Sequence, residues 1–195
     1  LDDLYKLSAE ESKRSVIILQ DAFTSFYESQ VVVEFYKLLK KLGFSVYVAP
    51  FHPNGKPLHV KGFLKKFRNV AERNAKWLTH IGGAGIPIVG LDPSVVLTYR
   101  DEYIKALGQN KLQIKVLLPQ EFLMMNQVNC RKHFLKLKHN SEVYHLLGHC
   151  TEKTTVEGSL ELWRDVFDLF GLNLFLINAG CCGMAGTYGH ETENY

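Results

Sequence analysis

Two of the four cysteines stand side by side near the end of the sequence, in the stretch NAGCCGMAGTYGHE. Adjacent residues form only strained disulfides, so a thiol–disulfide couple of Cys181 with Cys182 is the weakest of the candidate chemistries. The flanking Gly180 and Gly183 let the backbone approach a ligand closely and leave amide groups free to donate to sulfur. Paired thiolates in such a loop suit a multinuclear metal cluster better than a single small ion.

Cysteine usage as a whole favours metal binding or redox chemistry over structural disulfides. No secretory signal opens the sequence, and reducing compartments seldom keep disulfides, so we expect reduced thiols. A further thiol, Cys150, precedes the pair in the sequence. His149 and His190 could each join thiolates in a tetrahedral zinc site. Cys130, in the stretch MMNQVNCRKH, is expected to be a small buried hydrophobic residue rather than a ligand.

The sequence matches itself when it is shifted so that Ala22 falls on Cys150. This repeat alignment places SVIILQDAFTS on VYHLLGHCTEK, and without any gap it also pairs Gly43 with Gly171. Between these points the two copies carry matching apolar stripes at helical spacing. The two stretches are therefore predicted to share one local structure.

Each copy has the pattern of a buried strand, an amphipathic helix that ends at glycine, and a second strand. This alternation predicts the α/β class with parallel sheets, in two tandem strand-helix-strand modules of which the second is incomplete in this chain. Sites in such sheets lie at the carboxyl ends of the strands, so Cys150 is expected to meet Cys181 and Cys182 there. The predicted strands are Val16–Leu19, Phe44–Val48, Ile86–Leu91, Val143–Leu147 and Leu172–Ile177.

Three segments follow from this interpretation. They are a polar lead-in at 1–14, a first module at 15–140 and a second module at 141–195 that is truncated at its carboxyl-terminal end. The run HFLKLKHN alternates apolar and basic residues, which predicts an exposed strand or hairpin between the modules. The stretch HIGGAG precedes a strand, whereas a dinucleotide-binding loop follows one, so we expect a helix end and a tight turn there.

Composition argues against several classes of protein. Of the 195 residues, 46% are hydrophobic and 22% are charged, and the net charge is only +3, with Lys and Arg scattered along the chain. Neither a nucleic-acid footprint nor a patch for a membrane surface stands out. No apolar run approaches the ~20 residues that a membrane-spanning helix needs. We expect a cytoplasmic protein without a transmembrane segment, with peripheral association with the inner membrane as an alternative.

The motif GHC followed by GCCGMAGTYG resembles the cysteine-rich CCG module of heterodisulfide reductase and anaerobic glycerol-3-phosphate dehydrogenase subunits. From Ser15 to Tyr195, and through GLDPSVVLTYRDEY in particular, the chain is also similar to the iron–sulfur region of bacterial FAD-linked oxidases of the D-2-hydroxyglutarate and D-lactate dehydrogenase type. The resemblance implies an oxidoreductase in which an FAD-binding portion, absent here, oxidises a D-2-hydroxy acid. An iron–sulfur cluster in this region would then pass the electrons to a downstream acceptor.

Carried over residue by residue, the resemblance implies that Cys150, Cys181 and Cys182 are the ligands of the cluster, with His149 as a further candidate. A 4Fe–4S cluster is one type that these ligands fit. The alternative from another class is a zinc-stabilised structural or interaction domain without redox activity, in which thiolates and His149 or His190 bind the ion.

The first module departs from the family's pattern at each ligand position. Ala22, Pro53, Asn54 and Val95 stand where thiols are usual, so we expect this half to keep the scaffold without the metal. In the second module the closing cysteine is expected at the position that matches Val95, which would lie past Tyr195. We therefore do not expect this fragment to be catalytic alone.

Overall fold

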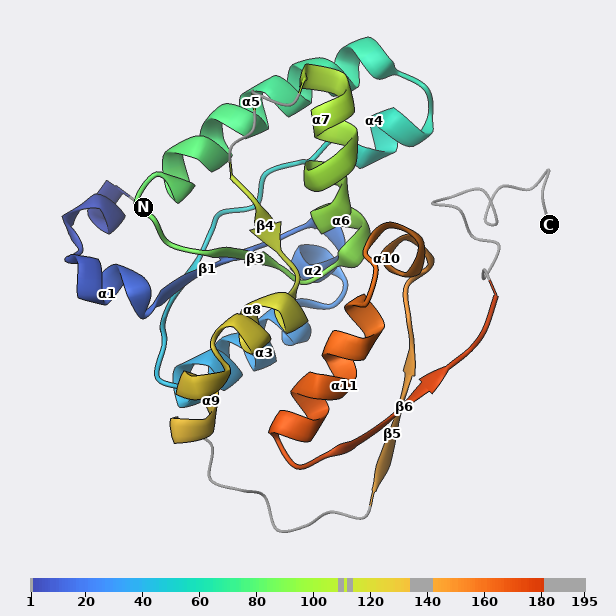
Figure 1. Ribbon diagram of the computed structural model, residues 1–195. Coiled ribbons are helices and arrows are strands. Elements are labelled where there is room, and N and C mark those ends of the chain that lie inside the picture. The colour runs from blue at the N-terminus through green and yellow to red at the C-terminus, as the bar shows by residue number, and fades with distance from the viewer. Residues whose placement is uncertain (1, 109–110, 112–113, 134–141, 181–195) are drawn as a thin grey trace.

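The computed structural model (Figure 1) describes residues 2–108, 111, 114–133 and 142–180. Two sheets of parallel strands, covered by helices, make up this part of the chain, and the predicted α/β class is confirmed. Several predictions lie outside the described residues: the strand or hairpin of HFLKLKHN after His133, and the sites assigned to Cys181, Cys182 and His190.

The first sheet consists of four parallel strands, β1 (Ser15–Leu19), β2 (Ser45–Val48), β3 (Ile88–Gly90) and β4 (Val116–Leu117). Their order is β2-β1-β3-β4, so β1 is an inner strand. All five residues of β1 are buried. A continuous apolar strand is expected where helices cover both faces of a parallel sheet.

One face of this sheet carries α3 (Ser29–Lys41), α8 (Pro119–Met125) and α9 (Gln127–His133), which lie below the strands in Figure 1. The predicted apolar stripe forms the inner side of α3, where Val32 and Leu39 are buried. This side packs against alternate residues of β1, so the helical and strand periodicities in the sequence define a common core.

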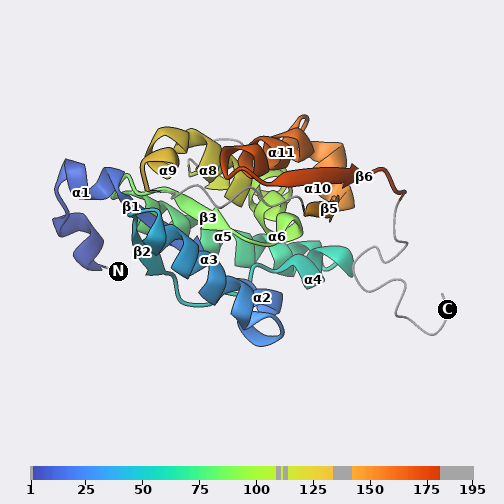
Figure 2. The ribbon, with the colours of Figure 1, turned by 90° about the horizontal axis from the view of Figure 1, so that it is seen from below.

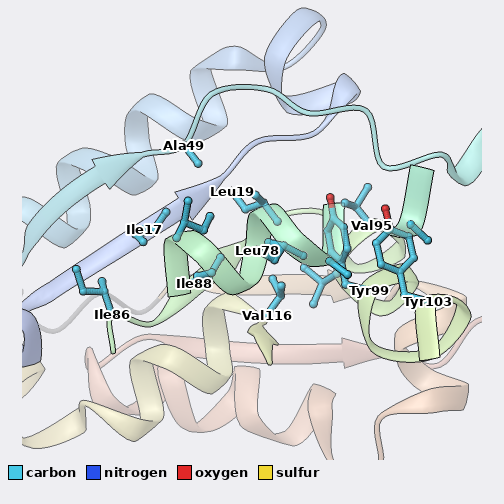
Figure 3. Close-up of a cluster of buried hydrophobic side chains, with 14 of the residues drawn as sticks. Ile17, Leu19, Ala49, Leu78, Ile86, Ile88, Val95, Tyr99, Tyr103 and Val116 are labelled. Atoms are coloured by element: carbon cyan, nitrogen blue, oxygen red, sulfur yellow. The ribbon is translucent and has the colours of Figure 1, made fainter. Parts of the chain in front are cut away.

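The other face carries α5 (Leu64–Gly82), which lies above the strands in Figure 1. Ile17 and Leu19 point from β1 toward Leu78 of α5, and all three are 2% exposed or less (Figure 3). The helix ends within HIGGAG as predicted, and Gly85 follows with φ +71°, a conformation that glycine adopts without strain.

Short helices connect these elements. Asp92 caps one of them, because its carboxylate accepts a hydrogen bond from the Val95 amide at 2.9 Å. The connecting elements are α2 (Ala22–Phe26), α4 (Lys56–Val60), α6 (Pro93–Leu97), the π-helical turn η2 (Thr98–Glu102) and α7 (Tyr103–Leu107).

The segment expected to be a polar lead-in is helical. It forms the 3₁₀ helix η1 (Asp2–Lys6) and α1 (Ala9–Lys13), and Ser8 begins α1 with a capping box. Leu4 is only 2% exposed and packs into the core that α5 covers. The lead-in is thus attached to the first sheet, whereas the division of the chain into modules stays a prediction.

The second sheet contains β5 (Val143–Leu147) and β6 (Asn173–Ile177), connected through α10 (Cys150–Thr155) and α11 (Ser159–Leu169). In Figures 1 and 2, α11 lies between this sheet and α8 of the first sheet's covering layer. Its buried side joins the same apolar core as α3 and α8. The second sheet is therefore attached to the first through a helix that both share.

The register of the second sheet repeats that of the first. Val16 pairs with Val46 in one, and the residues that the repeat alignment matches to them, Tyr144 and Leu174, pair in the other. The turns agree as well, since Gly43 and Gly171 both have positive φ, at +83° and +69°. The internal repeat predicted from the sequence is confirmed at the level of strand pairing.

Candidate metal centre

Cys150 is the first residue of α10, and Gly148 and His149 separate it from the end of β5 at Leu147. Its thiol is free and partly buried, at the carboxyl edge of the second sheet. This is the edge at which parallel α/β sheets bind their ligands. The structure thus positions Cys150 as the sequence predicted, with a soft sulfur donor available for iron or zinc.

His149 caps the helix that Cys150 begins. Its Nδ1 atom accepts a hydrogen bond from the Thr151 amide at 3.3 Å. Asp21 holds the matching position before Ala22 in the first module, where its carboxylate accepts from the amides of Phe23 and Thr24. In the neutral imidazole only one nitrogen has a free lone pair, so a metal at His149 would compete with this cap.

The end of β6 is tied to α10. Lys153, one turn after Cys150, donates a hydrogen bond from Nζ to the Ala179 carbonyl oxygen at 2.6 Å. Ala179 lies two residues before Cys181 in the sequence. At Gly180 an added Cβ would meet no atom of the described residues within 4 Å, so these residues leave the backbone there open to a ligand. The two segments that carry the predicted ligands therefore lie together up to the last described residue.

A buried hydrogen-bond network fixes α10 to its neighbours. The Glu152 carboxylate, 3% exposed, accepts from Gln120 Nε2 at 2.6 Å and from Ser159 Oγ at 2.7 Å. Gln120 lies on α8 and Ser159 on α11, so one carboxylate joins three helices. Sequence patterns gave no sign of this cluster, because each residue is polar and of a type usually exposed.

The matching corner of the first module is closed by protein groups. Asn74 donates to the Pro53 carbonyl oxygen at 2.7 Å, and the Tyr103 hydroxyl donates to the Asn54 carbonyl oxygen at 2.7 Å. Asn74 also donates to the Tyr103 oxygen at 2.9 Å. Burial raises the pKa of Tyr103, which keeps its hydroxyl protonated as a donor. Hydrogen bonds thus hold the backbone at Pro53 and Asn54, the residues that the repeat alignment matches to Cys181 and Cys182.

Cys130 is a core residue, as predicted. It is fully buried on α9, and its thiol donates to the Leu123 carbonyl oxygen at 3.8 Å. Burial raises the pKa of this thiol to about 11. Among the residues that the structure describes, no three His, Cys, Asp or Glu side chains come close enough together to bind a metal ion. Nor does this part of the chain contain a helix both long and apolar enough to cross a membrane.

Comparison with known proteins finds relatives along the whole chain. D-2-hydroxyglutarate dehydrogenase of Escherichia coli K12 is 43% identical over 195 residues, which are 100% of this chain and 19% of that protein. The enzyme of the same name from Pseudomonas putida is 44% identical over 191 residues, 98% of this chain and 18% of that protein. No protein-family model and no solved structure matches the chain.

A more distant relative is a subunit of the anaerobic glycerol-3-phosphate dehydrogenase of Escherichia coli K12, 29% identical over 187 residues, 94% of this chain and 46% of that protein. The chain is therefore similar to a region that larger dehydrogenases of more than one kind share. More specifically, it is similar along its full length to a region of the D-2-hydroxyglutarate dehydrogenases, and spans about a fifth of their length. The resemblance predicted from the cysteine motifs is confirmed.

Proposed function

We propose that the chain is the iron–sulfur electron-transfer region of an FAD-linked oxidoreductase that oxidises a D-2-hydroxy acid of the D-2-hydroxyglutarate or D-lactate type. Cys150, Cys181 and Cys182 are the cysteine ligands of the cluster in this proposal. The FAD-binding portion belongs to the same polypeptide or complex, and a downstream acceptor takes the electrons. This fragment alone does not carry out the oxidation.

The observation that carries the proposal is the hydrogen bond from Lys153 to the Ala179 carbonyl oxygen. It links the helix of Cys150 to the segment that leads into Cys181, so these two segments need not be brought together when both bind one cluster. Relatives named as dehydrogenases along the whole chain support the oxidoreductase class.

The chemistry of the reaction and two features of the chain suit this role. Oxidation of a 2-hydroxy acid releases two electrons and two protons, and a bound cluster supplies the one-electron transfer that divides such a pair. Cys150 offers a thiol fixed on a short helix, and the Glu152 network holds that helix in place. The described residues leave the backbone at Gly180 open, and amides of a glycine-flanked loop can donate to sulfur and raise the reduction potential.

The zinc-stabilised domain is the competing outcome. It needs a fourth ligand besides three thiolates, and His149 is the nearest candidate in the sequence. Its Nδ1 atom already accepts the capping hydrogen bond from Thr151, so metal binding there would sacrifice the cap. In the proposal, His149 therefore caps α10 and does not bind the metal.

The test is anaerobic purification of the whole natural polypeptide, followed by iron, sulfide and zinc analysis and by visible and electron paramagnetic resonance spectra. We expect a brown protein with iron and sulfide. Cys150→Ala and Cys181→Ala should each lose most of the cluster, while flavin reduction by the hydroxy acid persists and transfer to a one-electron acceptor fails.

Cys130→Ala is the matched control, since this thiol is buried away from the site and should leave the iron content unchanged. A colourless protein that contains zinc in place of iron would overturn the proposal. Full iron and sulfide in Cys150→Ala would reject the assignment of that ligand.

A further inference from the structure

The outer face of the second sheet is apolar and open to solvent. It is formed by alternate residues of β5 and β6, whose side chains point away from α11. Val143 is 50% exposed, Leu147 59%, Phe175 58% and Ile177 37%. The rings of His145 and Phe175 pack edge to face in the middle of this surface, with centroids 5.6 Å apart. Large side chains of this kind gather on one face because another apolar surface normally covers them.

The same face of the first sheet is buried. The repeat alignment pairs Leu147 with Leu19, which is 2% exposed, and Ile177 with Ala49, which is 0% exposed. What covers them there is α5, which contributes five residues to the same core cluster: Phe67, Ala71, Ala75, Leu78 and Ile81. The matched positions of the two sheets, which have the same strand register, thus differ in whether a helix covers them.

The edge of the second sheet is open as well. In the first sheet β3 pairs with the outer edge of β1, with Ile17 opposite Ile88. In the part of the chain that the structure describes, β5 pairs with β6 and with no further strand. The second sheet therefore has both an uncovered face and an unpaired edge at the places where the first sheet has α5 and β3.

The inner face of the second sheet offers no alternative place for such a helix. Tyr144 points from β5 to Phe167 of α11, with ring centroids 5.5 Å apart. On its other side α11 packs against α8, and Val166 and Phe170 are 3% and 8% exposed. Because α11 packs against the sheet on one side and against α8 on the other, a further helix can cover the second sheet only on its outer face.

We infer that the outer face and free edge of the β5–β6 sheet are the docking surface for a helix and strand of the same polypeptide, equivalent to α5 and β3 and contributed chiefly by the chain beyond Tyr195. The relatives are long enough to contain such a unit, because this chain spans only 19% of the D-2-hydroxyglutarate dehydrogenase of Escherichia coli. A strand after β6 that pairs beside β5 makes a right-handed crossover, the connection that parallel sheets use.

The chemistry of the occupant follows from α5. Its buried side presents apolar residues four positions apart, of which Ala71 and Ala75 are small enough for close approach to the strands, while Lys65, Lys66 and Arg68 belong to its polar side. We expect the docking helix to carry the same pattern: a narrow apolar stripe with alanines at its centre. A strand of β-branched residues should follow it.

The test uses the whole natural polypeptide with a photoreactive benzoylphenylalanine in place of Phe175, followed by mass spectrometry of the cross-linked peptides. We expect cross-links within one molecule, to the stretch that the repeat alignment pairs with α5. The same group in place of Phe26, which is 69% exposed on α2, is the control and should not reach that stretch.

Two cross-linking results would overturn the inference. One is a cross-link from position 175 to a second copy of the chain, and the other is a cross-link to any other part of the polypeptide. Hydroxyl-radical footprinting of the whole polypeptide gives a second measurement, in which Phe175 should be strongly protected and Phe26 reactive; equal reactivity would contradict the docking. Neither readout depends on a bound metal, so the inference and the proposed iron–sulfur function can fail separately.

Discussion

At the scale of single residues, Cys130 and Cys150 have different environments. Cys130 is enclosed by apolar side chains, whereas Cys150 lies partly exposed at a sheet edge. The sequence distinguished them through the repeat, because Cys150 falls on a repeated loop position and Cys130 does not. Reactivity should follow the same division, since an accessible thiol can reach electrophiles and metals whereas a buried thiol cannot.

The pH dependence of stability tests the burial of Cys130. Its pKa is raised from 9.0 to about 11 in the folded state, so the neutral thiol stabilises the fold fully below pH 9 and progressively less as the pH rises to about 11. We expect the difference in free energy of unfolding between wild type and Cys130→Ala to narrow across this window.

Urea denaturation at a series of pH values measures the difference. The buried tyrosines Tyr99 and Tyr103 also have raised pKa values, but they are present in both proteins and cancel. A difference that stays constant from pH 9 to about 11 would show that the Cys130 thiol ionises as freely in the folded chain as in the unfolded one.

At the scale of elements, the repeat made the long helices and inner strands predictable. Apolar periodicity marks α3 and α11, and positive-φ glycines mark their ends. The short helices α2 and α10 were not foreseen, because AFTSF and CTEKTT contain no apolar period and are held by their caps. The sequences that follow β5 and β6 do not predict that Gln120 of α8 hydrogen-bonds to Glu152 of α10.

One contact between elements is specific to the second module. An added Cβ on Gly148 would lie 2.6 Å from Leu160 Cδ2, so the end of β5 is packed tightly against α11. The repeat pairs Gly148 with Gln20 and Leu160 with Val32. The second module thus has a smaller residue at the strand end, Gly148, and a larger one on the helix, Leu160. Their close packing positions the strand end that precedes Cys150.

Gly148→Ala should therefore destabilise the chain by about 1–3 kcal/mol, the usual cost of overpacking. Leu160→Val in the same chain should recover part of the loss by making room. Gly180→Ala is the control, since a Cβ there meets no atom of the described part of the chain within 4 Å. Thermal or urea unfolding measures all three, and equal stability of Gly148→Ala and Gly180→Ala would contradict the packing argument.

At the scale of the whole molecule, the two sheets are joined by a shared helix and a buried polar network. α11 packs on one side against β5 and β6 and on the other against α8. The Glu152 carboxylate adds hydrogen bonds from Gln120 and Ser159 across the same junction. Contacts between residues so far apart in the sequence have no local sequence signature. The relative placement of the two sheets could therefore not be predicted from the sequence.

Glu152→Ala should lower the free energy of unfolding by about 1–3 kcal/mol, because it leaves the buried Ser159 hydroxyl without its acceptor and removes one of the two acceptors of the Gln120 amide, which keeps its hydrogen bond to Ser159 Oγ. Glu157→Ala removes an exposed carboxylate from the same region and should change stability by no more than about 0.5 kcal/mol. Denaturant unfolding of both variants makes the comparison, and equal stabilities would show that the network adds nothing to the junction.

The closed corner of the first module bears on how the molecule withstands oxygen. Asn74 and Tyr103 hold the Pro53 and Asn54 carbonyls with ordinary hydrogen bonds, so that half of the structure does not rely on sulfur chemistry. Oxidation of thiols in the second module therefore leaves these hydrogen bonds of the first module intact.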